Sequence, residues 1–203
     1  MLLSELKAFD AKYPITYREA LNAFAERRGL TVSEGSNARV LWAQGKGYAW
    51  RLWFDDDGFE RFIEFVKAHS GSPHLPKLLS KVREEPVQFK GMPAGMTIKF
   101  IRLEKLDELD VGSLSDAIDA IHGIPIDKAP DSIEKLEKMI RDGKLKLPSH
   151  SDLDHDEVAE EIMKHPVFFK LYLELLKNNG NDMSSGNVMM RGQTPVICDP
   201  FSD

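Results

Sequence analysis

The sequence contains a single cysteine, Cys198, among its 203 residues. One thiol cannot build an internal disulfide framework or a cysteine-rich zinc site, so both are excluded. No apolar run approaches the roughly 20 residues that a membrane-spanning helix needs. The first residues, MLLSELKAFDAKYP, include acids and lack a long apolar stretch, so we expect no secretory leader. These features favour a soluble protein in a reducing, cytoplasmic setting, with no membrane partner.

Positive charge is also scarce, since 27 Lys and Arg stand against 33 Asp and Glu and give a formal net charge of −6. Such a chain lacks the broad positive field that drives binding to nucleic-acid backbones, so we expect no nucleic-acid partner. With 42% hydrophobic and 30% charged residues, the composition is that of a folded domain. The length allows one domain, or two small lobes that share a cleft.

The N-terminal half predicts one helix, then strands around a second helix. Apolar side chains at helical spacing over residues 17–28 follow the N-cap candidate Thr16 and stop at Gly29. Short runs rich in β-formers, separated by turn sequences, follow. The predicted strands are 30–33, 38–42, 48–54, 78–83 and 96–103, with a helix over about 55–69 between the third and fourth.

The C-terminal half predicts mainly helices and one final hairpin. The helices are expected over 113–121, 132–141, 156–164 and 166–178, and the hairpin strands over 188–190 and 195–198. We therefore predict the α+β class, with a lobe boundary near residues 104–106.

Three polar residues near the C-terminus form a chemically suggestive set. Asp182 and Asn187 lie five residues apart in a loop, and Asp199 directly follows an apolar strand. Phosphoryl transfer uses one carboxylate to accept or orient a nucleophilic hydroxyl. It also uses hard oxygen ligands, such as an amide and a second carboxylate, to hold Mg²⁺ on the phosphates. The set therefore predicts a phosphotransferase that uses ATP and Mg²⁺.

These motifs resemble those of the protein-kinase superfamily. The run Asp182-Met183-Ser184-Ser185-Gly186-Asn187 resembles the kinase catalytic loop, and Cys198-Asp199-Pro200 resembles the magnesium-binding Asp-Phe-Gly motif. Most similar is the phage-encoded serine/threonine kinase type, whose motifs read Asp-Met-His-Ser-Gly-Asn and Thr-Asp-Pro. The resemblance implies that Asp182 is the catalytic base and that Asn187 and Asp199 bind Mg²⁺. It also implies transfer of the ATP γ-phosphate to a serine or threonine of a protein, such as a host protein.

The N-terminal half resembles a kinase nucleotide-binding lobe. Gly35 and Ser36 match part of a glycine-rich loop, which implies that they cover the phosphates, and Val40 would lie over the adenine. Tyr48-Ala49-Trp50-Arg51 occupies the place of the kinase Val-Ala-Ile-Lys strand. The resemblance implies Ala49 as the small residue over adenine and Arg51 as the cation on the phosphates.

The remaining elements of that lobe can be matched as well. Glu64 on the following helix is the expected partner of Arg51, and Glu60 is the second choice. Leu103, Glu104 and Leu106 match the last strand and the hinge, whose backbone binds adenine in kinases.

The resemblance implies a two-lobe protein-kinase-like fold in one minimal domain, residues 1–203. Residues 1–104 would form the N-lobe, with a five-stranded antiparallel sheet and one helix, and residues 105–203 the hinge and a reduced, mainly helical C-lobe. The chain departs from the family in Arg51 for the usual lysine, in Gly180-Asn181 for His-Arg, and in a single loop glycine. Only four residues follow Asp199, so we expect no activation-loop switch.

Two other functions stay open. Small-molecule kinases of the aminoglycoside or choline type share Asp-x-x-x-Gly-Asn loops and lack activation loops. A pseudokinase that serves as a binding module is favoured by Arg51 and by the single glycine.

Other notable residues have simpler interpretations. Cys198 is expected to be a small buried hydrophobe, not a nucleophile. The aromatic residues Tyr48, Trp50 and Trp53 are expected to pack within the sheet. A further polar cluster is expected to be a hydrated loop and helix cap, not a metal site: His150, Asp152, Asp154, His155 and Asp156.

Overall fold

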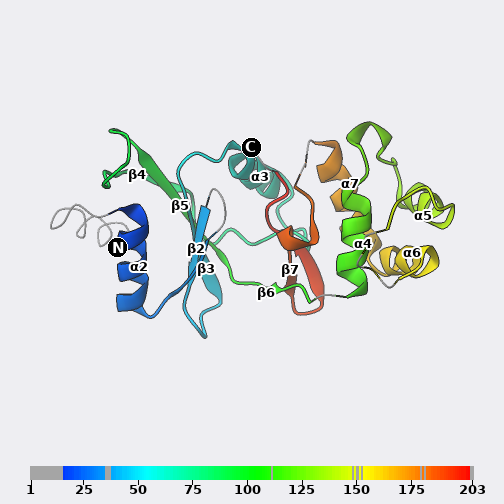
Figure 1. Ribbon diagram of the computed structural model, residues 1–203, viewed down its shortest axis with the longest axis horizontal. Coiled ribbons are helices and arrows are strands. Elements are labelled where there is room, and N and C mark those ends of the chain that lie inside the picture. Colours follow the sequence, from blue (N-terminus) through cyan, green and yellow to red (C-terminus); the bar gives the residue numbers. More distant parts are fainter. Residues whose placement is uncertain are drawn as a thin grey trace. The chain divides into compact units, whose positions relative to one another are not determined.

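The computed structural model describes residues 16–34, 38–110, 112–147, 149, 151, 153–178, 180 and 182–201. The chain divides into two compact units, one of residues up to Asp56 with Lys77–Lys105, and one of Asp57–Pro76 with the residues from Leu106 onward. Figure 1 labels most of the elements. In chain order they are α2 (Tyr17–Arg28), β1 (Thr31–Glu34), β2 (Ala38–Trp42), β3 (Tyr48–Trp53), α3 (Asp57–Ala68), β4 (Arg83–Pro86), β5 (Thr97–Glu104), β6 (Asp107–Glu108), α4 (Ser113–His122), the 3₁₀ helix η1 (Ile126–Lys128), α5 (Ile133–Arg141), α6 (His155–Lys164), α7 (Pro166–Lys177), the 3₁₀ helix η2 (Ser185–Asn187), β7 (Val188–Arg191) and β8 (Thr194–Ile197).

The first unit is built on a five-stranded sheet in the order β1-β2-β3-β5-β4, with every pair antiparallel. Gly45, with a φ of 74°, makes the turn between β2 and β3. The predicted α+β class with a five-stranded antiparallel sheet is confirmed. One strand was misplaced: β4 covers Arg83–Pro86, and in the predicted range 78–83 Leu78 makes an isolated bridge to Leu103.

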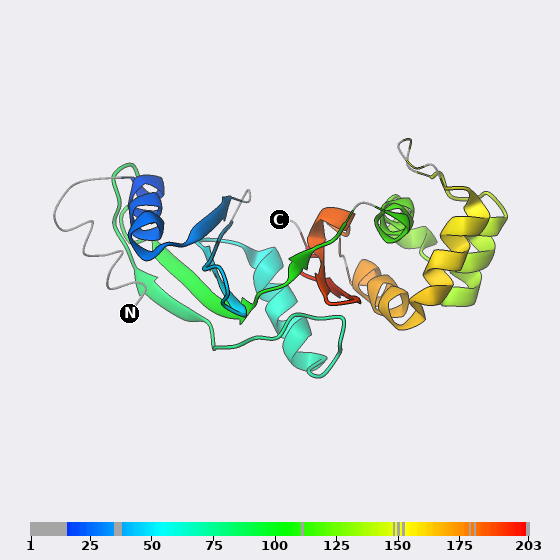
Figure 2. The same cartoon turned by 90° about the horizontal axis from the view of Figure 1, so that it is seen from below.

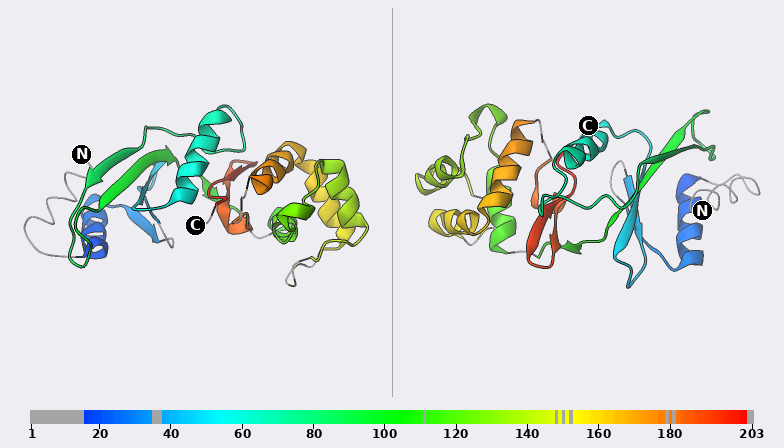
Figure 3. Two further views of the ribbon diagram at one scale, coloured as in Figure 1. Left: turned by 90° about the horizontal axis from the view of Figure 1, so that it is seen from above. Right: turned by 180° about the vertical axis from the view of Figure 1, so that it is seen from behind.

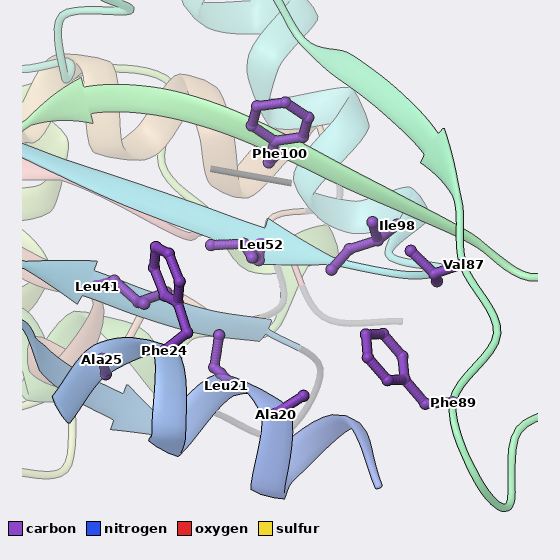
Figure 4. Close-up of a cluster of buried hydrophobic side chains, with 10 residues drawn as sticks. All are labelled: Ala20, Leu21, Phe24, Ala25, Leu41, Leu52, Val87, Phe89, Ile98 and Phe100. Atoms are coloured by element: carbon purple, nitrogen blue, oxygen red, sulfur yellow. The ribbon is translucent and has the colours of Figure 1, made fainter. Parts of the chain in front are cut away.

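Helix α2 covers one face of this sheet (Figure 3). Thr16 and Glu19 form a reciprocal capping box at its start, and Gly29 ends it with a φ of 61°. The buried side chains of Leu21 and Phe24 belong to one apolar cluster with residues of β2, β3 and β5 (Figure 4). Burial of this apolar surface is the main force that holds α2 on the sheet.

The second unit combines helices α3 to α7 with a small sheet in the order β6-β7-β8. Helix α6 lies beside α4 and α5 (Figures 2 and 3). Helix α7 begins with Pro166 at a position where proline is tolerated, and buries Phe168, Phe169 and Tyr172 completely. The sequence assigned α3 to the N-terminal lobe, but its residues cluster with the second unit.

Four hydrogen bonds join the segment after α3 to the final hairpin. The ring Nδ1 of buried His74 lies 2.9 Å from the Pro195 carbonyl oxygen, and the Ile197 N–H donates to the His74 carbonyl at 3.0 Å. Arg191 donates to the carbonyl oxygens of Pro73 and Leu75 at 2.6 and 3.0 Å. Segments about 120 residues apart in the sequence therefore form one piece of structure. None of the helices in the described part of the chain is both long and apolar enough to cross a membrane.

Candidate functional site

Three hydrogen bonds join the segments that carry Asp182, Asn187 and Asp199. The Asp182 N–H donates to the Pro200 carbonyl at 3.1 Å, and the Cys198 N–H donates to the Asn187 carbonyl at 2.8 Å. The Asn187 side-chain amide donates to the Asp182 carbonyl at 2.9 Å. The loop and the strand end are therefore one connected structure, and the three predicted residues belong to it.

The hairpin β7–β8 positions two members of this set. Val188 pairs with Ile197, so Asn187 precedes one strand and Asp199 follows the other by two residues. Val188, Val196 and Ile197 are buried, which anchors both strands in the unit. Gly192, with a φ of 61°, makes the turn between them.

The amide of Asn187 has a defined orientation. Because only the NH₂ end can donate to the Asp182 carbonyl, Oδ1 is the end that remains for a cation. Asp182 and Asp199 are both half-buried. The described residues contain no cluster of three His, Cys, Asp or Glu that could bind a metal. One amide oxygen with one or two carboxylates fits Mg²⁺, which keeps several of its water ligands.

The backbone just before the loop requires glycine. A Cβ at Gly180 would lie 2.8 Å from the Leu175 carbonyl oxygen, a distance that real Cβ atoms essentially never show. The Gly180 N–H donates to that same carbonyl at 2.9 Å and closes the end of α7. The sequence showed Gly180 only as a departure from the kinase pattern, whereas the structure gives it a steric reason.

Helices α4 and α7 supply two contacts to the loop that sequence reasoning missed. The hydroxyl of Tyr172 on α7 donates to the Met183 carbonyl, and Asp119 on α4 accepts hydrogen bonds from Ser185. Burial, and next the negative charge of Asp119, raise the pKa of Tyr172. Neither residue lies in a motif, so no local signal could have identified them.

The phenylalanine after Asp199 and Pro200 packs on the start of α3. A Cβ at Gly58 would lie 2.7 Å from the Phe201 carbonyl oxygen, so the two backbones approach closely. The Arg61 guanidinium lies 5.0 Å from the centre of the Phe201 ring. Helix α3 is thus in direct contact with the segment that carries Asp199.

Four predicted nucleotide-binding residues share one face of the five-stranded sheet. Val40 pairs with Arg51, and Ala49 pairs with Leu103. Cross-strand partners point to the same face, and side chains alternate along each strand. Leu52, the neighbour of Arg51 on β3, belongs to the cluster with α2. Arg51 and the three residues on its face therefore point away from α2.

Arg51 has a carboxylate partner within its own unit. Its guanidinium donates to Asp56 at 3.0 Å, and the two side chains are 12% and 6% exposed. The predicted partner Glu64 accepts instead from Lys67 at 2.6 Å, and both of those side chains are exposed. The role of Glu64, and of Glu60 as the second choice, stays a prediction.

The predicted hinge residues have structural contacts of their own. The Glu104 N–H donates to the Lys77 carbonyl at 3.1 Å, and the Glu104 carboxylate accepts from the Lys77 N–H at 2.7 Å. Leu106 is buried. Adenine binding by Leu103, Glu104 and Leu106 stays a prediction. Gly35 and Ser36 lie outside the described residues.

The simpler predictions can be compared with the structure too. The thiol of Cys198 is half-buried and contacts the Val196 carbonyl oxygen at 3.5 Å. Trp53 is buried, and Tyr48 and Trp50 pack edge-on to each other.

The expected helix cap in the polar cluster is present. Asp154 caps α6, His155 contacts the Leu145 carbonyl oxygen, and Asp156 pairs with Arg141. His150 and Asp152 lie outside the described residues.

Comparisons with known proteins gave one kind of match. No protein family and no curated protein matches the chain. Among solved structures that match is a spectinomycin phosphotransferase, APH(9)-Ia, in complex with ADP and spectinomycin. The identity is 12% and the TM-score 0.35, over 85% of this chain and 63% of that one, so this chain spans less than two-thirds of its length. A likeness of this size assigns neither an activity nor a substrate.

One prediction needs correction against this finding. The sequence pattern predicted a serine/threonine protein kinase, whereas the matching structure is a phosphotransferase of spectinomycin, a small molecule. The prediction of a serine/threonine protein kinase is not borne out by this match, and it is not proposed again. The phage or bacterial-effector type and a protein acceptor find no support either.

Proposed function

We propose that this chain is an ATP- and magnesium-dependent phosphotransferase whose acceptor is the hydroxyl group of a small molecule. The observation that carries the proposal is the connected set of Asp182, Asn187 and Asp199, tied together by hydrogen bonds at 2.8 to 3.1 Å. Catalysis of phosphoryl transfer consists mainly of positioning and charge neutralisation, which such a fixed set of oxygens can supply.

Each residue of the set has a defined role in this proposal. The Asp182 carboxylate orients the acceptor hydroxyl and accepts its proton. The Asn187 amide oxygen and the Asp199 carboxylate would hold Mg²⁺, which neutralises charge on the phosphates when bound. Because the Asn187 NH₂ group bonds to the Asp182 backbone, the base and one metal ligand keep a fixed spacing.

The sheet face opposite α2 is the proposed nucleotide-binding surface of the first unit. Val40, Ala49 and Leu103 offer an apolar surface for adenine, and Arg51 offers positive charge to the phosphates. Gly35 and Ser36 are proposed to cover the phosphates with their backbone N–H groups.

A cationic acceptor is supported by the distribution of charge along the chain. Residues 106–203 contain 20 Asp and Glu against 10 Lys and Arg, whereas residues 1–105 contain 13 against 17. The excess of acidic residues in the part of the chain that carries the proposed base attracts amine-bearing substrates and raises their local concentration. The proposed acceptor is therefore a small hydroxylated amine.

The direct test measures transfer of radiolabelled γ-phosphate from ATP to a panel of hydroxylated amines and neutral alcohols with Mg²⁺. Asp182→Asn and Asp199→Asn should each abolish labelling, while Asp127→Asn, at an exposed position of η1, should leave it unchanged. Labelling that persists in both active-site variants would contradict the proposal.

A nucleotide-binding module without catalysis is the second candidate. It is favoured by the pairing of Arg51 with Asp56, which engages the cation that would serve the phosphates. This alternative predicts ATP binding by calorimetry but no turnover with any acceptor. Arg51→Lys separates the two, because a catalytic cation should retain or raise activity as lysine.

A further inference from the structure

Both carboxylate oxygens of Asp119 accept hydrogen bonds from one residue of the loop, Ser185. The Ser185 N–H donates to Oδ1 at 2.8 Å, and the Ser185 hydroxyl donates to Oδ2 at 3.0 Å. The two residues lie 66 positions apart, on α4 and at the first position of η2. Hydrogen bonds to an ionised acceptor are about twice as strong as neutral ones.

The segment that receives this contact is a single short turn. Helix η2 has only three residues, Ser185–Asn187, and its first N–H groups have no partner within so short a helix. The Asn187 N–H donates to the Ser184 carbonyl at 3.0 Å, and the Val188 N–H donates to the Ser185 carbonyl, so the Ser185 N–H itself has no acceptor within the turn. An external acceptor at Ser185 therefore decides where the turn begins.

We infer that Asp119 is a positioning residue that fixes η2 and, through it, the spacing of Asp182 and Asn187. The inference rests on the proposed function, because that function makes the spacing important. Asp119 holds the loop at Ser185, between the proposed base and the proposed metal ligand. Tyr172 holds the same loop at the Met183 carbonyl, so two helices fix it from two points.

A direct catalytic role for Asp119 fits the geometry less well. A base or metal ligand needs an oxygen directed at the substrate or the ion, whereas both Asp119 oxygens are engaged by Ser185. The expected effect of its removal is therefore on the loop, and only then on the reaction.

The test compares Asp119→Ala with a matched control on the same helix. Asp116 lies one turn earlier, is buried where Asp119 is half-buried, and accepts from the hydroxyl of Ser151, a residue outside the loop, at 2.8 Å. We expect Asp119→Ala to lower kcat about 10- to 100-fold with little change in KM for ATP, as expected for loss of a charge-assisted contact. Asp116→Ala should lower the unfolding temperature about as much as Asp119→Ala does, but it should leave kcat near that of the wild type.

The conservative variant gives a second readout. Asparagine at position 119 can accept from the Ser185 N–H and donate to the Ser185 hydroxyl, so Asp119→Asn should recover most of the kcat lost in Asp119→Ala. Amide hydrogen exchange at Ser185 should be slow in the wild type and in Asp119→Asn, and fast in Asp119→Ala.

The outcomes separate this inference from the proposed function. If Asp119→Ala and Asp116→Ala behave alike in kcat and in exchange at Ser185, Asp119 is merely structural and the inference fails. A wild type without phosphoryl transfer would instead overturn the proposed function. The exchange at Ser185 would still decide whether Asp119 fixes the loop.

Discussion

At the scale of single residues, the side-chain amide of Asn187 serves two neighbours that need opposite chemistry. Its NH₂ group donates to the Asp182 carbonyl, and its oxygen is the end proposed to face a cation. Aspartate has the same shape but no donor. The choice of Asn at this position is therefore a consequence of hydrogen bonding, not of metal affinity.

This difference predicts the result of Asn187→Asp. The new carboxylate should still bind a divalent cation, but it would face the Asp182 carbonyl without a donor. We expect kcat to fall at least about 10-fold, the cost of one lost and unsatisfied hydrogen bond. Steady-state kinetics at saturating Mg²⁺ would measure it.

A matched control for this change lies at the end of α7. The Asn178 amide donates to the Glu174 carbonyl at 2.8 Å in an exposed position. Asn178→Asp should alter stability slightly and kcat not at all. Equal effects of the two substitutions on kcat would argue against the assigned role of Asn187.

The contact of Tyr172 with the Met183 carbonyl can be tested by measuring stability at alkaline pH. Burial raises the pKa of Tyr172 above the value near 10 that it has when unfolded. The neutral hydroxyl therefore contributes stability that is fully present below pH 10 and is lost as the pH rises above it. The loss should approach about 1.4 kcal/mol per pH unit while the folded tyrosine stays neutral.

Tyr172→Phe should be less stable than the wild type at pH 7 but less sensitive to alkaline pH. It should cost about 1 to 2 kcal/mol at pH 7, because the buried Met183 carbonyl loses its donor, and should lose less stability between pH 10 and 11. Urea unfolding at both pH values measures the difference. Half-buried Tyr17, whose pKa is also raised by burial, is present in both proteins, so its contribution cancels in the comparison. Parallel pH curves for wild type and variant would refute the prediction.

At the scale of elements, the contact between α3 and Phe201 constrains a helix residue that is normally replaceable. Glycine within a helix costs about 1 kcal/mol relative to alanine, so Gly58→Ala would usually stabilise. Here the added methyl group would lie 2.7 Å from the Phe201 carbonyl oxygen. We expect a lower unfolding temperature and reduced activity, because Asp199 is two residues from Phe201.

The control for this prediction is Gly123→Ala, at the end of α4. Gly123 has an ordinary φ of −76°, and a Cβ added there would meet no atom within 4 Å. This change should be neutral or slightly stabilising in thermal unfolding. A stabilised Gly58→Ala variant would show that the close approach can relax without cost.

The elements also show which parts of the fold the sequence could predict. Helix α2 was predicted with its observed bounds, 17–28, because Thr16 and Gly29 mark its ends chemically. Strand β4 was missed, because Arg83-Glu84-Glu85-Pro86 contains no strong β-former and ends in proline. It is a strand because it pairs with β5, and the residues of β4 alone do not predict that pairing.

The same distinction applies to the candidate site. Asp182, Asn187 and Asp199 could be predicted as candidates because their spacing is local and their chemistry is specific. Asp119 and Tyr172 act through contacts with Ser185 and Met183, 66 and 11 residues away, and leave no pattern in the sequence. The pairing of Arg51 with Asp56 also depends on how the chain turns after β3.

At the scale of the whole molecule, the uneven charge gives a test of the acceptor class. With twice as many acids as bases in residues 106–203, a cationic acceptor is attracted electrostatically, and salt screens that attraction. Raising NaCl from 50 mM to 500 mM should increase KM several-fold for amine acceptors. Neutral alcohols of similar size should show little change. An identical salt dependence for both classes would exclude charge as the basis of selection.

The division of the chain also has a consequence for biosynthesis. Residues 57–76 belong to the second unit, yet the contacts of His74 with Pro195 span 121 positions. On the ribosome, α3 emerges long before the hairpin that completes its surroundings, and local contacts cannot substitute for it. The first unit is also assembled from two stretches of chain, because residues 57–76 between β3 and β4 belong to the second unit. A nascent chain should therefore form the α2-covered sheet early, and the loop of residues 182–187 should take its final conformation only when residues near 200 have been made.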